Sequence, residues 1–477
     1  MPPDQPPPKQ PPAKPPLQIR ANSLSWLPFV IPILYLGFVF WLQPPDRLGD
    51  PLVAPWLGRL LYDDYDWTAI ALRGLNARAG RSPGRSDDPC DDPLNKEPLH
   101  ESLKQRRPLR SRYFLEYPYA AVWLFELGQD VSGLPNAGTS PAILDACHNR
   151  IVQFEPGSPA ERSLWQGFRR TIRVYEVMAI ASLLGLMLVV RLGYQRDWNT
   201  GRFGYLVLPA VLYFTLNRFD IWPALLTAGS LACLGRERFA ASGILLGTAA
   251  MVKVFPILLA PFVFAYLWRR GRGVRAWSIA LAATVLVLFL PPLLRYGWQA
   301  TWAPYQYQLT RPLEGYTLYG FVLPNAMGQP GPPWNLIRLA ILGITTAVLL
   351  VRPPSSLIGV LRRGAIALIV FLSLQLFYSP QWIVWLVPLL VPLAGAQRFV
   401  GPLLIVLDAI TYLTFPVVYD RVGPLATYDG LHYWMMASLI CARGAVFALL
   451  VAVLAWGEIA DRFRLHSSPP AEFQEES

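Results

Sequence analysis

Long apolar runs recur along this chain from Leu24 to Trp456, and short charged loops separate them. Hydrophobic residues make up 53% of the 477 residues and charged residues only 15%, which is too apolar for an ordinary soluble protein. Inside a bilayer the backbone must satisfy its own hydrogen bonds, so repeated apolar runs favour membrane-spanning helices. We therefore expect an all-α, polytopic helical membrane protein whose first partner is the lipid bilayer.

The net charge of +11 also fits a membrane protein, because many of the Lys and Arg residues lie in short loops between apolar runs. Basic loops of this kind mark the cytoplasmic side of a membrane protein. The charge therefore predicts how the chain is oriented in the membrane, and no nucleic-acid partner is expected.

Both ends of the chain are expected in the cytoplasm. Residues 1–22 are proline-rich and basic, which predicts a disordered tail. Leu24–Leu42 is the first span; a cleaved signal peptide is the alternative, but no small-residue cleavage site follows. The membrane domain is expected over residues 23–462, with a short tail at 463–477.

The region 43–170 is mostly polar and is expected to form a large first loop on the extracytoplasmic side. Leu52–Leu61 and Trp67–Leu75 have the pattern of short amphipathic helices at a membrane surface, and 80–110 has the composition of a flexible loop. Tyr113–Leu127 is apolar but only about 15 residues long. Because the basic loop after the next span belongs in the cytoplasm, this segment is expected to dip into the membrane without crossing it.

The remaining apolar segments alternate with basic loops and bring the expected number of crossings to about twelve. They are 172–190, 203–216, 221–234, 239–252, 256–268, 277–294, 336–351, 365–378, 382–393, 399–419 and 431–456. A long aromatic loop, 295–334, is expected on the outer side. The pattern is that of a multi-pass protein of the cell membrane.

Several of these segments hold only about 14 apolar residues, roughly 21 Å of helix against a hydrocarbon core of about 30 Å. Short spans leave their ends in a polar environment or thin the bilayer. The short ends fall on the expected outer side, at Asn217–Asp220, Lys253 and Ser379–Gln381. We expect these three tips to meet there.

Asp63, Asp64 and Asp66 place three carboxylates within four positions, directly after the first span. Carboxylates this close repel one another, and sites that need a base or bind a cation are built in this way. A solvated loop or a helix N-cap is the structural alternative. Their position on the outer side favours a catalytic base or a cation site.

The tip with Asn217, Arg218 and Asp220 carries either a self-neutralising turn or an arginine that holds an anionic group in an outer cavity. Lys253, at the next tip, is either a lysine that extends its amine to the membrane surface or a second phosphate-binding cation. Both tips are candidate substrate-binding positions.

Gln381 and Trp382 follow Pro380 at the third outer tip, which Pro380 alone explains as a turn. The functional interpretation is that Gln381 donates to a sugar or phosphate and that Trp382 stacks on a sugar face. Tyr117 belongs either to an interfacial aromatic anchor or to a cavity wall. The aromatic residues of 295–334 bind carbohydrate or form an aromatic belt, and the sequence does not separate these two.

Five short elements in order along the chain resemble the membrane glycosyltransferases of the C superfamily, family 87 in particular. They are Asp64-Tyr65-Asp66-Trp67, Tyr117-Pro118-Tyr119, Asn217-Arg218-Phe219-Asp220, Lys253-Val254-Phe255-Pro256 and Ser379-Pro380-Gln381-Trp382. The resemblance covers about residues 24–395. Each element is weak by itself, and their shared order and spacing carry the likeness. The loop between Asp66 and Tyr117 is longer than the family pattern, and Tyr119 stands where the family has proline.

The resemblance implies an inverting transferase that takes a sugar, a mannose-like hexose or a pentose, from a polyprenyl-phosphate donor. The acceptor would be a glycan or glycolipid on the outer membrane face. Carried onto this sequence, a first-loop carboxylate is the general base, with Asp64 favoured over Asp66, and Arg218 and Lys253 stabilise the departing phosphate. The superfamily is mixed in its need for a divalent cation, so the resemblance leaves that question open.

Two other classes compete with the enzyme. A transporter or lipid-linked sugar flippase would place ionisable groups in mid-membrane and show symmetric repeats. The chain has no evident internal repeat, and Asp408 is the main charge away from a span end. A non-catalytic partner in envelope synthesis would tolerate the loss of Asp64 and Asp66.

Overall fold

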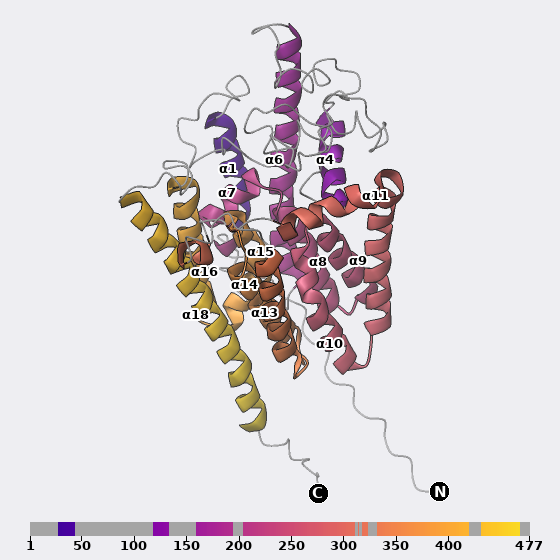
Figure 1. Ribbon diagram of the computed structural model, residues 1–477, viewed down its shortest axis with the longest axis vertical. Coiled ribbons are helices and arrows are strands. Elements are labelled where there is room, and N and C mark those ends of the chain that lie inside the picture. The colour runs from indigo at the N-terminus through magenta and orange to yellow at the C-terminus, as the bar shows by residue number, and fades with distance from the viewer. Residues whose placement is uncertain are drawn as a thin grey trace, which may run out of the picture.

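The computed structural model describes residues 27–42, 118–132, 159–193, 204–310, 313, 317–322, 332–418 and 431–467. Every regular element in these ranges is helical, which confirms the all-α prediction for the described part of the chain. The elements, coloured along the chain in Figure 1, are α1 Leu27–Leu42, α4 Tyr119–Ser132, α6 Pro159–Gly193, α7 Pro209–Asn217, α8 Ile221–Gly235, α9 Phe239–Val252, η5 Phe255–Leu259, α10 Ala260–Arg270, α11 Val274–Thr310, α12 Leu318–Val322, α13 Pro332–Leu350, α14 Leu357–Ser373, η7 Pro380–Trp382, α15 Ile383–Ala396, α16 Val400–Tyr412, η8 Leu413–Val418 and α18 Leu431–Ser467.

Four stretches are long and apolar enough to cross a membrane: Arg173–Leu192, Val274–Leu294, Val400–Val418 and Trp434–Ala460. Further apolar helices of 10–17 residues, α1, α8, α9 and α15 among them, are shorter than a full span. The structure therefore shows a helical protein with membrane-spanning character. The number of twelve crossings stays a prediction.

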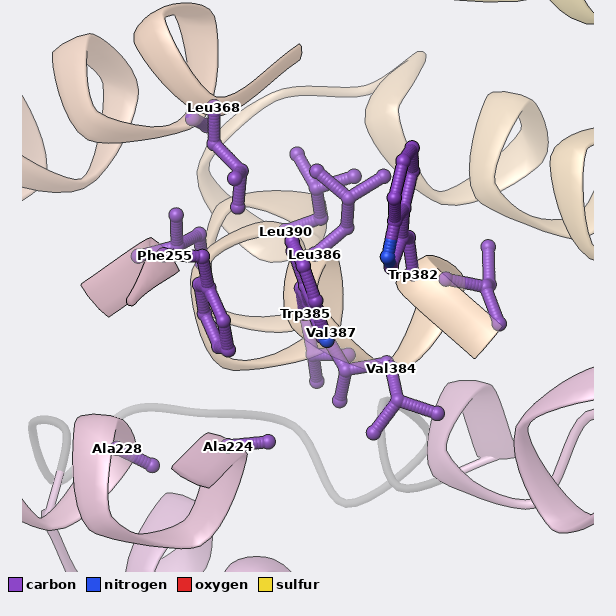
Figure 2. Packing of buried hydrophobic residues seen from close by; sticks show 14 of the residues in the cluster. Ala224, Ala228, Phe255, Leu368, Trp382, Val384, Trp385, Leu386, Val387 and Leu390 are labelled. Carbon is purple, nitrogen blue, oxygen red and sulfur yellow. The ribbon is translucent and has the colours of Figure 1, made fainter. Parts of the chain in front are cut away.

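Two groups of helices meet at α15. Figure 1 shows α18 along one side of the molecule and α11 along the other, with α8, α9, α14 and α15 between them. α15 is buried around its whole circumference from Ile383 to Leu393, as expected of a helix that is apolar on every face. Figure 2 shows its side chains packed between Leu368 of α14 and the small Ala224 and Ala228 of α8.

α9 and α11 pack backbone to backbone because α9 carries two glycines four residues apart on one face. A Cβ atom added at Gly243 would collide with the carbonyl oxygen of Trp277. A Cβ atom added at Gly247 would lie 3.1 Å from the carbonyl oxygen of Leu281. Small residues at this spacing allow close helix–helix approach in membranes.

Basic residues tie several helix ends together. Arg236 donates to the carbonyl of Leu192 at the end of α6, and Arg270 and Arg272 both pair with Glu237 in the turn between α8 and α9. At the same kind of tip, Arg269 donates to the carbonyl of Pro353. These contacts bring the ends of α6 and α8, the turn after α10 and the chain after α13 together.

Two segments differ from expectation. The crossing expected at 203–216 is a buried helix, α7, of nine residues, about 13 Å long and far short of the hydrocarbon core. The loop expected at 295–334 is helical as far as Thr310, because α11 continues past a kink at Gly297, where φ is 77° and glycine has no Cβ penalty. In the sequence, 203–216 is a continuous apolar run and 295–334 is rich in aromatic residues, glycine and proline, so neither feature is visible there.

Asp408 explains why so short a helix as α7 is stable inside the protein. Leu208, the residue before α7, supplies no side-chain hydrogen bond to cap this helix. Instead the carboxylate of Asp408, from α16, accepts hydrogen bonds from the backbone N–H groups of Ala210 and Val211, both at 3.1 Å. A carboxylate at a helix N-terminus satisfies unpaired donors and complements the helix dipole.

Candidate functional site

The three short tips predicted from the sequence do meet, and Asp220 lies where they meet. Its Oδ1 atom is 2.7 Å from Nζ of Lys253, which follows α9. The indole N–H of Trp385, in the first turn of α15, donates to the same oxygen. Asp220 is fully buried and Lys253 is 13% exposed. We call Asp220, Lys253, Phe219 and Trp385 the Asp220 cluster.

Local sequence places these side chains. α7 ends at Asn217, whose amide donates to the carbonyl of Tyr213 at 2.8 Å, and Arg218 then turns to an extended conformation. Asp220 follows directly and begins α8. Lys253 is likewise extended at the end of α9, just before Pro256 starts a short 3-10 helix. In each case the chain leaves a helix at a polar residue. The side chains of Asp220 and Lys253 then meet between the helices.

Aromatic rings enclose the lysine. Its Nζ atom lies 4.3 Å from the ring centroid of Phe219 and 5.5 Å from that of Trp385. Trp385 is in turn stacked on Phe255, with centroids 4.3 Å apart and planes at 8°, and Figure 2 shows it between Phe255 and Trp382. Cation–π contacts of this kind stabilise a desolvated cation by up to about 2 kcal/mol.

Trp382, which the sequence suggested for stacking on a sugar face, is buried in the structure. It is only 4% exposed and packs against Phe377, Tyr378 and Trp385, with ring centroids 5.1, 5.6 and 5.3 Å away. Its ring is therefore packed among protein rings in this structure. Asn217 is also fully buried and bonded to its own helix, which is a structural role.

Gln381 is 7% exposed, and its Oε1 atom has no hydrogen-bond partner among the described residues. A buried carbonyl oxygen without a partner is costly unless a ligand or water serves it. Gln381 thus stays a candidate for binding a hydroxyl group. Arg218, at the first tip, is half-buried.

α4 brings a further predicted element to the Asp220 cluster. Phe125 of α4 packs on Phe219 and on Trp222, with ring centroids 5.2 Å away in both cases. The hydroxyl of Tyr175 in α6 donates to the carbonyl of Phe125 at 2.8 Å and fixes α4 in place. The residue Tyr117 lies outside the described residues, but the helix that directly follows it contacts the cluster.

Asp63, Asp64 and Asp66 also lie outside the described residues. Within the described ranges no group of three His, Cys, Asp or Glu side chains has the arrangement of a metal site. The divalent cation that the resemblance leaves open is therefore still an open question for this chain.

No protein-family model matches this chain, and none of the curated proteins compared with it matches either.

Two arginines that sequence reasoning did not select, the buried Arg443 and the half-buried Arg338, contact the chain just before Trp382. The guanidinium carbon of Arg443, in α18, is 3.3 Å from the ring centroid of Tyr378, and this side chain is 5% exposed. Arg338, in α13, donates to Oε1 of Gln375 at 2.9 Å. A lone arginine inside an apolar membrane helix is a signal of function, and it would have identified both.

The aromatic residues of the expected outer loop form a ladder on the last turns of α11. Trp298 and Trp302 are stacked with centroids 5.5 Å apart and planes at 9°, and Tyr305 stacks next at 5.3 Å. Burial raises the pKa of Tyr305 to about 12. The rings cover one another in part, and either interpretation, carbohydrate binding or an aromatic belt, fits this arrangement.

Proposed function

We propose that this chain is an integral-membrane glycosyltransferase. It moves a mannose-like hexose or a pentose from a polyprenyl-phosphate donor to a glycan or glycolipid acceptor on the extracytoplasmic side. The observation that carries this proposal is the Asp220 cluster, where the tips at the ends of α7 and α9 and at the start of α15 meet. These tips belong to elements whose order along the chain carries the family resemblance. A polar, aromatic-lined junction of short membrane helices suits a lipid-linked sugar phosphate.

The chemistry is a single displacement. A carboxylate of the first outer loop, Asp64 in the first instance with Asp66 and Asp63 as alternatives, takes the proton of the acceptor hydroxyl. The acceptor oxygen forms a bond to the anomeric carbon while the bond from that carbon to the phosphate oxygen breaks. The phosphate leaves with the electron pair, and the configuration at the anomeric carbon inverts.

The geometry modifies the role of Lys253. Because Asp220 compensates its charge at 2.7 Å, Lys253 is held rigidly and acts on a phosphate as one end of an oriented ion pair. Asp220 is therefore a positioning residue in this proposal. Arg218, which is half-buried and lies at the same tip as Asp220, is the second cation of this proposal.

The position of Asp408 favours the enzyme over a transporter or flippase. It was the main charge in mid-span, and such charges in transporters lie on an ion or substrate pathway. Here both carboxylate oxygens are bonded to the start of α7. A structural cap explains this aspartate without any transport function.

A reconstituted transfer assay tests the proposal. Purified full-length protein in lipid nanodiscs would receive radiolabelled polyprenyl-phosphate mannose, then the corresponding pentose donor, with a membrane glycolipid extract as acceptor. We expect label to move into the acceptor with one donor, with inverted anomeric configuration. Movement of the intact donor across proteoliposomes without any transfer would instead establish the flippase.

A further inference from the structure

Arg338 lies next to an exposed apolar face of α13. α13 is an apolar helix, and the residues around Arg338 that point outward are large and apolar: Leu336 is 72% exposed, Ile337 53% and Leu339 50%. Arg338 itself is half-buried against the protein. A charged group beside hydrocarbon-facing leucines needs a polar or anionic partner at the same level of the membrane.

Neutral groups of neighbouring segments accept hydrogen bonds from the guanidinium of Arg338. Nη1 donates to Oε1 of Gln375 at 2.9 Å, and Nη2 donates to the backbone carbonyl of Gln308 at 3.5 Å. Gln375 is buried and is fixed through its own amide, which donates to the carbonyl of Phe371 at 3.1 Å. These contacts join α13 to the end of α11 and to the chain after α14, so Arg338 does not simply extend along its helix towards water.

The positive charge of Arg338 has no carboxylate within 4.0 Å among the described residues, and its remaining N–H groups make no further hydrogen bond to them. Lys253 differs in this respect, because Asp220 already balances its charge. A guanidinium has five donors in a planar fork that matches two oxygens of a phosphate. Arg338 is therefore better suited than Lys253 to receive a new anion.

Asn335 adds an independent observation one turn earlier on the same face of α13. Its amide donates to the carbonyl of Leu309, and its Oδ1 atom has no hydrogen-bond partner among the described residues although the side chain is 4% exposed. Residues three apart on a helix lie next to each other. Arg338 could therefore donate hydrogen bonds to a phosphate, while the buried Oδ1 atom of Asn335 accepts one from a neighbouring hydroxyl group.

We propose that Arg338 binds the phosphate of a lipid phosphate whose hydrocarbon chain lies along the exposed face of α13, with Gln375 positioning the guanidinium. Where the lipid is the polyprenyl-phosphate donor, the proposal rests on the proposed function, and Arg338 then takes the donor phosphate in place of Lys253 and Arg218. The phosphate of an ordinary membrane phospholipid offers the same chemistry. The binding experiment below separates the two sources.

The experiment measures the binding of decaprenyl phosphate to the purified full-length protein in detergent, by native mass spectrometry and fluorescence competition. Decaprenol, which lacks the phosphate, and phosphatidylglycerol are measured beside it. The variants are Arg338→Gln and Arg338→Lys, and the matched control is Arg352→Gln, an exposed arginine just beyond the other end of α13.

We expect Arg338→Gln to weaken binding of decaprenyl phosphate by about tenfold or more, and Arg338→Lys by about threefold to tenfold because lysine lacks the fork. Decaprenol binding and the Arg352→Gln variant should be unchanged. If phosphatidylglycerol competes equally and loses affinity in parallel, the site takes any lipid phosphate; if it does not compete, the site is for the donor.

Decaprenyl phosphate binding equal to wild type in folded Arg338→Gln would overturn the proposal. Should that variant fail to fold, unchanged binding by Arg338→Lys would have the same meaning. The readout is independent of catalysis. Loss of binding in Arg338→Gln, with no transfer from any donor by the wild type, keeps the phosphate site and removes the transferase. Normal binding and normal transfer by Arg338→Gln remove the phosphate site and keep the transferase.

Discussion

At the scale of single residues, the ion pair between Asp220 and Lys253 is the feature on which the candidate site depends. It lies in an aromatic enclosure where water cannot replace either partner. In such surroundings the loss of one partner leaves an uncompensated charge, which costs about 3–5 kcal/mol. The loss of both partners is milder, because no lone charge then remains.

This difference gives a first prediction. Lys253→Met and Asp220→Asn should each lower the temperature of thermal unfolding in detergent, and the Lys253→Met variant should be the worse of the two because it leaves a buried carboxylate. The double variant should be more stable than the sum of the single effects implies. Additive effects would show that the two side chains are not coupled.

A second prediction concerns the indole N–H of Trp385. Trp385→Phe keeps a ring on Phe255 but removes the donor to Asp220, and we expect a loss of about 1–3 kcal/mol, since a charged acceptor loses a buried hydrogen bond. Trp277→Phe is the matched control, because the N–H of this buried tryptophan has no partner among the described residues. Equal losses in the two variants would attribute the effect to ring size alone.

At the scale of the element, α7 depends on a cap from another helix. Asp408→Ala should expose the amides of Ala210 and Val211 and destabilise α7 by about 1–2 kcal/mol. Hydrogen exchange should accelerate at these two amides first and then along the helix to Asn217. Exchange unchanged at Ala210 and Val211 would mean that the cap does not hold the helix.

The contact of α9 with α11 provides a second prediction for an element. Gly243→Ala should destabilise the protein by about 1–3 kcal/mol, because the added methyl collides with the backbone carbonyl of Trp277. Gly343 in α13 has open space where a Cβ would go, so Gly343→Ala should be neutral or slightly stabilising. Unfolding temperatures of the two variants in the same detergent decide this.

Some of these elements were predictable and others were not. The tips at Asn217–Asp220, Lys253 and Ser379–Gln381 were identifiable because each interrupts an apolar run with a polar residue or proline. Which side chains pair was not, because Asp220 selects Lys253 from another helix only once α8 and α9 are packed. The sequence suggested its neighbour Arg218 instead.

The same reason explains why the burial of Trp382 and the length of α7 differ from expectation. An aromatic residue next to a polar turn looks available to a ligand, and only tertiary packing against Tyr378 and Trp385 covers it. The apolar run at 203–216 looks like a span. Only in the folded structure, where Asp408 of α16 caps its start, is it seen to contain a short helix inside the protein. Local pattern fixes the element types here, and the packing between helices fixes their roles.

At the scale of the whole molecule, the basic tips gather around Glu237 and Pro353, and the sequence predicts that they face the cytoplasm while the Asp220 cluster faces the opposite side. We expect a single cysteine at position 272, in an otherwise cysteine-free protein, to react with an impermeant reagent only from the cytoplasm. A cysteine at position 140 should react only from outside. Labelling of both from one side would refute the predicted topology.

The most direct test of the central claim is single-turnover sugar transfer by the wild type and by Asp64→Asn, with Asp63→Asn and Asp66→Asn beside them. Asp88→Asn is the control for a loss of charge in the same outer region. We predict that one of the three variants, Asp64→Asn first, loses about 10²–10⁴-fold in transfer rate while donor binding and folding are retained. Transfer at the wild-type rate in all three variants and in the triple variant would contradict the account.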